Sequence, residues 1–133
     1  MNTSPIERFL QSPAFAVIGA SSNREKYGNK VLRCYMQHRK VVYPVNPLKQ
    51  QIEGIPVVHS INELPKEVKS ISVITPPQFT EYNVDEAIKK GIENIWMQPG
   101  TESDSAIKNA IEHRMNVIAG GPCILVFMGY EEH

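Results

Sequence analysis

Five short apolar runs of four or five residues recur along the chain and define its regular structure. They are rich in valine and isoleucine, as the buried strands of parallel sheets are. The expected strands cover residues 15–18, 41–45, 70–74, 94–97 and 116–119.

Segments with a helical spacing of apolar residues separate these strands. Val31, Leu32 and Tyr35 share one face of a helix expected over residues 29–39. Ile107, Ala110 and Ile111 are spaced for burial in a helix over residues 103–114. The other expected elements are a short helix from Ser4-Pro5 to Ser12-Pro13, an excursion over 55–58, a helical turn over 60–65 and a helix over 79–90 ended by Gly91.

This alternation predicts an α/β fold, with a five-stranded, mainly parallel sheet and helices on both faces. We expect a single Rossmann-like, doubly wound domain over residues 1–133, with its core at about residues 14–123. A chain of this length is large enough to bury a sizeable core.

The charge balance excludes several classes of protein. With 14 basic and 14 acidic residues the formal net charge is zero, so no overall field attracts nucleic acid or an anionic membrane. No apolar run approaches the roughly 20 residues of a membrane span, and the N-terminus lacks the apolar segment of a secretory signal. Cys34 and Cys123 do not make a disulfide framework. We expect a cytoplasmic protein with reduced thiols.

Glycine, proline and small polar residues follow every expected strand, in residues 19–22, 46–49, 75–77, 98–100 and 120–123. Such residues also end strands for purely structural reasons, which accounts for one or two loops more readily than for five. In open parallel sheets the ligand binds beyond the carboxyl ends of the strands, near the point where the strand order reverses. The pattern therefore predicts one ligand site shared by these loops.

The first loop favours a phosphate but lacks the dinucleotide fingerprint. Gly19 permits a tight turn, Ser21 and Ser22 can hydrogen-bond a phosphate, and the helix behind offers its free N–H groups. Lys26 is either a phosphate partner or a solvated side chain. The fingerprint requires glycine at the third and sixth loop positions, which are Ser21 and Arg24 here.

The second loop bears on the choice of nucleotide. An NAD enzyme needs an acidic residue at the end of the second strand, where this chain has Asn46. Lys49 instead favours an adenosine ligand with an extra ribose phosphate, a description that NADP and coenzyme A both meet. The prolines of residues 75–77 form a stiff ledge for an adenine face or a thin chain, or simply begin the next helix.

Other chemistry leaves little trace in the sequence. No Cys or His spacing predicts a metal site, and neither a Gly-x-Ser-x-Gly elbow nor a Walker loop occurs. Cys123 is either a packing residue or a thiol near the sulfur end of a coenzyme, where disulfide exchange can occur. We expect the strand over 116–119 near the sheet centre, Cys123 over the pocket mouth, and Cys34 shielded by packing.

Five segments carry a resemblance to a known family: VIGASSNREKYGNKV, YPVNPLKQQIEGIPV, VITPPQFTEYNVDEAI, WMQPG and GGPCIL. In this order, over residues 15–123, they resemble the CoA-binding domain family, the small stand-alone relatives of the N-terminal domain of the succinyl-CoA synthetase α subunit. The resemblance implies a Rossmann-like fold and coenzyme A, or an acyl-CoA, as the ligand.

The resemblance also assigns residues to parts of the ligand. At the phosphates it implies Ala20, Ser21, Ser22 and Lys26. Lys49 matches the family's CoA-contacting lysine and follows Val45, Asn46 and Pro47. The adenosine or pantetheine would lie along Thr75, Pro76 and Pro77, and the thiol end near Gln98 and Gly100.

Departures from the family bear on activity. The synthetase carries its phosphorylated histidine on a second domain, which we do not find in these 133 residues, and the segment ILVFMGYEEH differs from the family's Arg- or His-containing ends. We expect a protein that binds CoA or acyl-CoA without catalysing a reaction by itself. The alternatives are an NADP-binding oxidoreductase-like domain, a CoA-binding subunit of a multi-chain acyl-CoA synthetase, and an interaction domain. A partner chain or a homo-oligomer is compatible with each.

Overall fold

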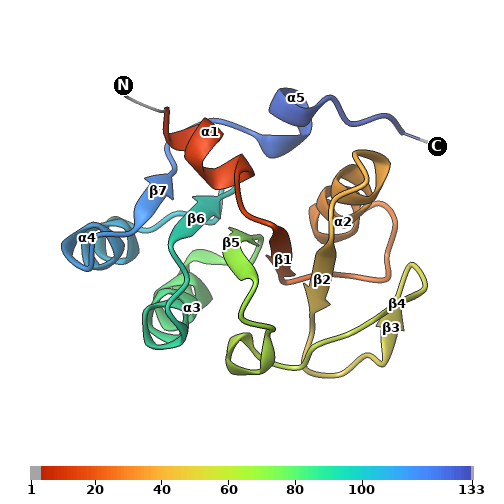
Figure 1. Ribbon diagram of the computed structural model, residues 1–133, viewed down its shortest axis with the longest axis horizontal. Coiled ribbons are helices and arrows are strands. Elements are labelled where there is room, and N and C mark those ends of the chain that lie inside the picture. Colours follow the sequence, from red (N-terminus) through yellow and green to blue (C-terminus); the bar gives the residue numbers. More distant parts are fainter. Residues whose placement is uncertain (1–3, 133) are drawn as a thin grey trace.

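Strands and helices alternate in the computed structural model, which describes residues 4–132 (Figure 1). Residues 1–3 and 133 of the expected domain lie outside the described residues. The strands are β1 (Ala14–Ile18), β2 (Val42–Val45), β3 (Gln51–Ile52), β4 (Ile55–Pro56), β5 (Val68–Val73), β6 (Asn94–Met97) and β7 (Asn116–Ile118). The helices are α1 (Pro5–Leu10), α2 (Tyr27–Gln37), the 3-10 turn η1 (Ile61–Glu63), α3 (Pro77–Lys90), α4 (Asp104–Glu112) and α5 (Ile124–Met128).

Five strands form one parallel sheet in the order β2-β1-β5-β6-β7, and β3 and β4 form a small antiparallel hairpin. The chain passes from β1 to β2 on one side, then crosses back to β5 on the other side of β1. The strand order therefore reverses between β1 and β5, where Ile18 pairs with Val73. The predicted α/β fold is confirmed, and this point is where its ligand is expected.

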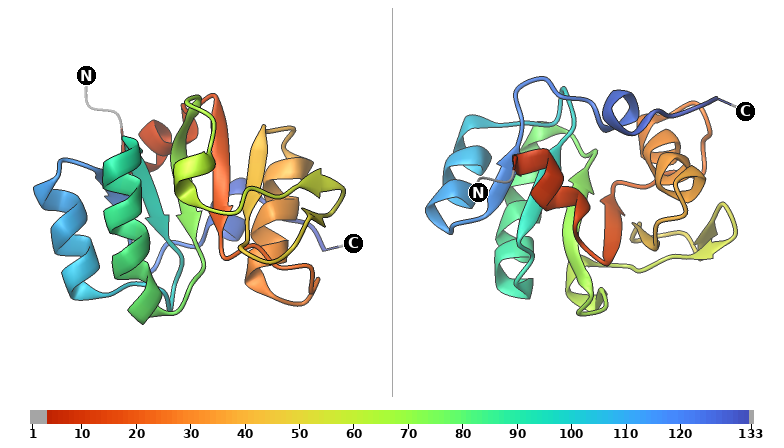
Figure 2. Two further views of the ribbon diagram at one scale, coloured as in Figure 1. Left: turned by 90° about the horizontal axis from the view of Figure 1, so that it is seen from below. Right: turned by 45° about the horizontal axis from the view of Figure 1, so that its top comes forward.

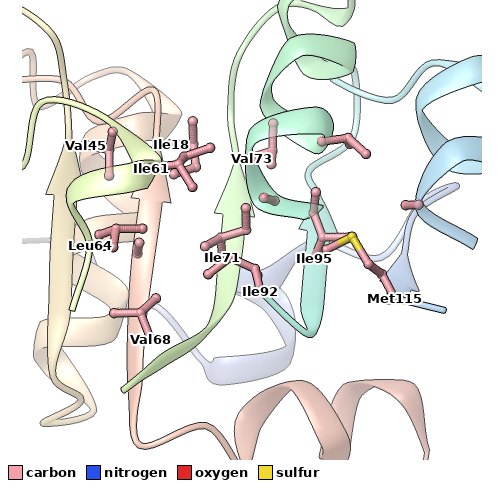
Figure 3. Packing of buried hydrophobic residues seen from close by; sticks show 14 of the residues in the cluster. Ile18, Val45, Ile61, Leu64, Val68, Ile71, Val73, Ile92, Ile95 and Met115 are labelled. Carbon is pink, nitrogen blue, oxygen red and sulfur yellow. The ribbon is translucent and has the colours of Figure 1, made fainter. Parts of the chain in front are cut away.

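Helices cover both faces of the sheet. α1, α2 and α5 lie on one face, and α3 and α4 lie on the other (Figure 1 and Figure 2). Along β1, Phe15 and Val17 face α1 and α2, whereas Ala16 and Ile18 face the opposite cluster, which Figure 3 shows. Burial on both faces explains why β1 is apolar at every position.

The position expected for the last strand is wrong. β7 is an edge strand, and β5 is the central one. After the crossover to β5, each helix returns the chain to the next outward position, so β6 and then β7 extend the sheet away from β1. Hydrophobic pattern alone does not report this direction, because a short buried strand has the same composition at either place.

Ile111 is a second correction, because its side chain is 59% exposed rather than buried. α4 covers the end of the sheet, over β7 and beside α3, so its buried face is narrow and is formed by Ala106 and Ala110, with Ile107 half-buried. The hairpin of β3 and β4 and the helix α5 were not expected from the sequence. Among residues 4–132 no helix combines the length and the apolar character needed to cross a bilayer.

Aromatic residues organise the face beneath α1 and α2. The Phe15 and Tyr35 rings stack at 4.9 Å between centroids, and the Phe9 and Trp96 rings meet edge to face at 5.4 Å. The Tyr35 hydroxyl and the Ser72 hydroxyl, both fully buried, are 2.7 Å apart and share a hydrogen bond. This bond satisfies two polar groups that would otherwise be desolvated without a partner.

The variant Tyr35→Phe is expected to lower the free energy of unfolding by about 1–3 kcal/mol, because it leaves the buried Ser72 hydroxyl unpaired. Ser72→Ala should cost a similar amount for the same reason. The double variant should lose less than the sum, since neither unpaired group remains. Urea denaturation of the four proteins measures this coupling, and strictly additive losses would contradict it.

Candidate functional site

The turn between β1 and α2 is built by two close backbone approaches. Gly19 has a φ of +92°, and a side chain there would also press on the Thr75 methyl group. A Cβ at Gly28, in the first turn of α2, would overlap the Gly19 carbonyl oxygen. Glycine at these two positions lets the N-terminus of α2 pack directly against the turn.

Side chains inside the turn order its backbone. The Ser21 hydroxyl accepts from the Asn23 N–H at 3.0 Å, and the Asn23 side-chain oxygen accepts from the Glu25 N–H at 3.0 Å. Lys26 is the N-cap of α2 but gives no side-chain cap, and the first turn of α2 has no acidic residue. The positive end of the α2 dipole is thus open to an anion at this turn.

Asn46 joins the loop after β2 to this turn. Its amide nitrogen donates to the Ala20 carbonyl at 3.0 Å, while its oxygen accepts from the Leu48 N–H at 2.8 Å and the Lys49 N–H at 3.1 Å. The Asn46 side chain therefore links the backbones of the loops that follow β1 and β2. Lys49 is exposed on this loop.

Three adjoining cavities follow the carboxyl edge of the sheet, and Thr75 lines all of them. The turn cavity, of about 590 Å³, is lined by Gly19, Ala20, Ser21, Glu25, Lys26, Tyr27, Gly28, Asn46, Ile74, Thr75 and Pro76. The β2 cavity, of about 310 Å³, is lined by Ile18, Gly19, Val45, Asn46, Pro47, His59, Ser60, Ile61, Thr75, Phe79, Tyr82, Asn83 and Glu86. The β6 cavity, of about 480 Å³, is lined by Tyr27, Ile74, Thr75, Pro76, Pro77, Gln98, Pro99, Gly100, Thr101 and Cys123.

The structure gathers nearly all of the predicted site residues around these cavities. Ser22 and Lys49 are the exceptions: both are exposed, and neither is among the lining residues. The turn cavity shares Gly19 and Asn46 with the β2 cavity, and shares Tyr27, Ile74 and Pro76 with the β6 cavity. The three hollows thus form one track, with the β1–α2 turn in the middle.

Several lining residues were missed in the sequence. Phe79, Tyr82 and Asn83 lie one turn apart on α3 and border the β2 cavity, and their i, i+3, i+4 spacing behind a loop at the ligand edge is a usable signal. His59 has no such signal, because the crossover alone brings it to Lys49, where its ring nitrogen is 3.2 Å from the carbonyl oxygen. Among the described residues no cluster of three or more potential metal ligands occurs.

Three side chains from β6 and the loop behind it hold the turn that carries Cys123. The Trp96 indole N–H donates to the Pro122 carbonyl at 3.0 Å, and the Gln98 oxygen accepts from the Ile124 N–H at 3.0 Å. The Glu102 carboxylate accepts from the Gly120 N–H at 3.3 Å and from the Gly100 N–H at 2.6 Å.

These bonds explain how Cys123 lines the β6 cavity although β7 is an edge strand. The chain after β7 turns back over the end of β6 toward α5, on the other face of the sheet (Figure 1). The Gln98 amide nitrogen also lies 3.5 Å from the Cys123 sulfur, and Gln98 itself is buried. Proximity to the cavity therefore comes from the returning turn and not from a central strand.

The fold and the position of the cavities define a Rossmann-like α/β domain with its candidate site at the topological switch point. Residues 13–128 match the model of the CoA binding domain family. The chain belongs to this family, as the resemblance predicted.

Curated relatives extend well beyond this domain. The chain is 29% identical over 91 residues to the alpha subunit of the ADP-forming acetate–CoA ligase II of Pyrococcus furiosus. This match covers 68% of this chain and 20% of the relative. It is 31% identical over 105 residues to the ADP-forming acetate–CoA ligase I of Archaeoglobus fulgidus. This match covers 79% of this chain and 15% of the relative. The chain thus spans a fifth or less of the length of these two ligases.

Solved structures include proteins of similar size. A conserved hypothetical protein from Pyrococcus furiosus is 35% identical with a TM-score of 0.82, and the match covers 86% of this chain and 97% of that one. A hypothetical protein from Pyrococcus horikoshii is 29% identical with a TM-score of 0.85, over 92% and 85% of the two chains. The shared fold therefore extends over almost the whole of both proteins.

The two cysteines differ in environment. Cys34 is fully buried in α2, as expected, and burial, together with the nearby Cys123, raises the pKa of its thiol to about 11. Cys123 is half-buried at the β6 cavity. Because the thiolate is the attacking species, Cys34 is disfavoured both by access and by protonation.

With CoA disulfide, Cys123 is expected to form a mixed disulfide faster than Cys34. The Cys123 thiolate attacks one sulfur of the disulfide, a protein–CoA disulfide bond forms, and the other half leaves as the CoA thiolate. Mass spectrometry followed by peptide mapping measures both sites. Modification of Cys34 alone, or of neither cysteine, would make Cys123 a packing residue.

Proposed function

We propose that this domain binds coenzyme A, or an acyl-CoA, along the track of three cavities at the carboxyl edge of the sheet. The observation that carries the proposal is that the track has a phosphate-type turn in its middle and an apolar hollow at one end. CoA has a matching order of parts: an adenosine bearing a ribose phosphate, a diphosphate, and a thin pantetheine arm that ends in sulfur.

The diphosphate is assigned to the β1–α2 turn, where the open N-terminus of α2, Ser21 and Lys26 favour an anion. The adenosine is assigned to the β2 cavity, between Pro47 and the aromatic side chains of α3. Two exposed residues are assigned to phosphates that face solvent. They are Lys49, in the loop after β2, and Ser22, in the β1–α2 turn.

The pantetheine arm is assigned to the β6 cavity. Its path follows Pro76 and Pro77 to Gln98 and Gly100 and ends at Cys123. Prolines at this ledge present apolar surface and few N–H donors, which suits an alkyl amide chain more than a second phosphate. An acyl group on the sulfur would lie at the same end.

We propose as a second function that the domain supplies the CoA site of an acyl-CoA synthetase together with a partner chain. The relatives named as ADP-forming acetate–CoA ligases support this, because each is several times longer than the matched region. In that arrangement the remaining ligase chemistry comes from the partner, and residues 1–133 act as a single CoA-binding domain. Co-purification of the endogenous complex and an assay for CoA-dependent acid activation test this second function.

CoA is expected to raise the melting temperature, whereas NAD and NADP at equal concentration leave it unchanged. A ligand that binds only the native state stabilises it by about 2.7 kcal/mol at 100 times its Kd. A thermal-shift series with the three ligands measures the difference. A larger shift with NADP than with CoA would favour the oxidoreductase-like alternative and overturn the proposal.

Lys49→Ala is expected to weaken CoA binding about 10- to 150-fold, because a charge-assisted hydrogen bond to the ribose phosphate contributes roughly 1.5–3 kcal/mol. Dephospho-CoA, which lacks that phosphate, should lose much less. The control is Lys66→Ala, since Lys66 is an exposed lysine in the loop before β5, at the opposite edge of the sheet. Titration calorimetry gives the six affinities of the three proteins for the two ligands, and equal losses for both ligands in Lys49→Ala would show that Lys49 does not contact that phosphate.

A further inference from the structure

A buried guanidinium lies behind the β1–α2 turn. Arg33, on the second turn of α2, is only 5% exposed. Its Nε donates to the Asn29 side-chain oxygen at 2.6 Å, and its Nη2 donates to the Arg24 carbonyl at 2.7 Å. Its Nη1 is buried and has no hydrogen-bond partner in the described residues. A buried charge is costly unless its surroundings compensate it. The Arg33 guanidinium therefore depends on contacts from neighbouring segments of the chain.

Asn29 binds both Arg33 and the turn. It is fully buried, and its amide nitrogen donates to the Ser21 carbonyl at 2.8 Å and to the Glu53 carboxylate at 3.1 Å. Together, Arg33 and Asn29 fix the backbone carbonyls of Arg24 and Ser21. These carbonyls belong to the turn of which Ser21, Glu25 and Lys26 line the turn cavity.

The C-terminal segment, residues 129–132, runs beside α2 and reaches Arg33 from the other side (Figure 1 and Figure 2). The Gln37 side chain anchors it through two bonds to the Glu131 backbone, at 2.7 Å and 3.0 Å. Beyond this anchor, the Glu132 carboxylate lies 3.5 Å from the Arg33 Nη2. The Tyr130 ring centroid is 5.5 Å from the Arg33 Cζ, in the range of a cation–π contact.

We infer that Arg33 is a positioning residue for phosphate binding, and that the C-terminal segment holds it in place through Tyr130 and Glu132. This inference rests on the proposed CoA function of the same site. The contacts form a series. The segment orders Arg33, Arg33 and Asn29 order the turn, and the ordered turn presents its donors to the phosphates. Preorganised donors bind more tightly because the ordering cost is met before the ligand arrives.

The chain that leads to this segment also starts at the β6 end of the track. α5 begins directly after Cys123, which lines the β6 cavity, and residues 129–132 follow α5 to Arg33. None of residues 124–132 lines any of the three cavities. The segment's effect on the ligand is therefore exerted through Arg33 and not by contact.

The two contacts on Arg33 differ in strength. The Glu132 side chain is 58% exposed, so its ion pair is weakened by solvent and its loss should change the affinity about 2- to 5-fold at most. The Tyr130 ring is half-buried against the guanidinium, and a cation–π contact of this kind corresponds to about 3- to 30-fold in an equilibrium constant. Tyr130→Ala is therefore the main variant, and Tyr130→Phe, which keeps the ring, is its rescue.

The experiment compares the full chain with its Tyr130→Ala, Tyr130→Phe and Glu132→Gln variants. Glu112→Gln is the matched control, because Glu112 is a 59% exposed carboxylate paired with Lys108 on α4, on the opposite face of the sheet. Titration calorimetry gives the affinity for CoA, for adenosine 3′,5′-bisphosphate and for pantetheine. Hydrogen–deuterium exchange of the ligand-free protein follows the amides of residues 20–27.

We expect Tyr130→Ala to weaken CoA and the bisphosphate by the same factor, about 3- to 30-fold, and to leave pantetheine unchanged. Exchange at residues 20–27 should accelerate, while Tyr130→Phe and Glu112→Gln match the parent protein. Unchanged exchange in Tyr130→Ala would overturn the inference, as would an equal loss for pantetheine. If the parent protein binds none of the three ligands, the proposed function fails, and the exchange data still decide whether the segment orders the turn.

Discussion

The crossover from β2 to β5 is the constraint on which the rest of the structure depends. Because the chain returns on the far side of β1, the loops after β1 and β5 leave the sheet in opposite directions and cannot cover the edge between them. Gly19 and Thr75 meet at this gap, and Thr75 lines all three cavities. The site is thus a consequence of connectivity, and the side chains around it adapt an opening that the topology provides.

Glycine at position 28 then brings α2 close to that opening. At Gly28 there is no room for a side chain, so α2 begins in contact with the turn that it supports, and its N-terminal dipole is directed at the turn cavity. Asn46 and Asn29 hold the same turn from its two sides through the carbonyls of Ala20 and Ser21. This turn is therefore held by one side chain from the loop after β2 and one from α2, in addition to the bonds inside it.

The β6 end of the track is held in a different way. The turn that carries Cys123 follows an edge strand, and side chains from β6 and the loop behind it hold this turn over the sheet. α5 continues from it across the outer face of the domain and joins α2. One continuous segment thus runs from the β6 cavity to Arg33, behind the β1–α2 turn.

The sequence by itself predicted the five strands of the parallel sheet, the class of fold, the family and about half of the residues that line the cavities. Strand burial and the glycine, proline and amide residues behind each strand are local properties, and parallel strands bring all such loops to one edge. Only the tertiary structure decided that β7 is an edge strand, that Ile111 is exposed, and that His59 borders the site. It also decided that Glu132 meets Arg33 across 99 residues of chain. These features depend on the direction of each crossover and on how far a helix extends past the sheet, which neither hydrophobic spacing nor a loop motif encodes.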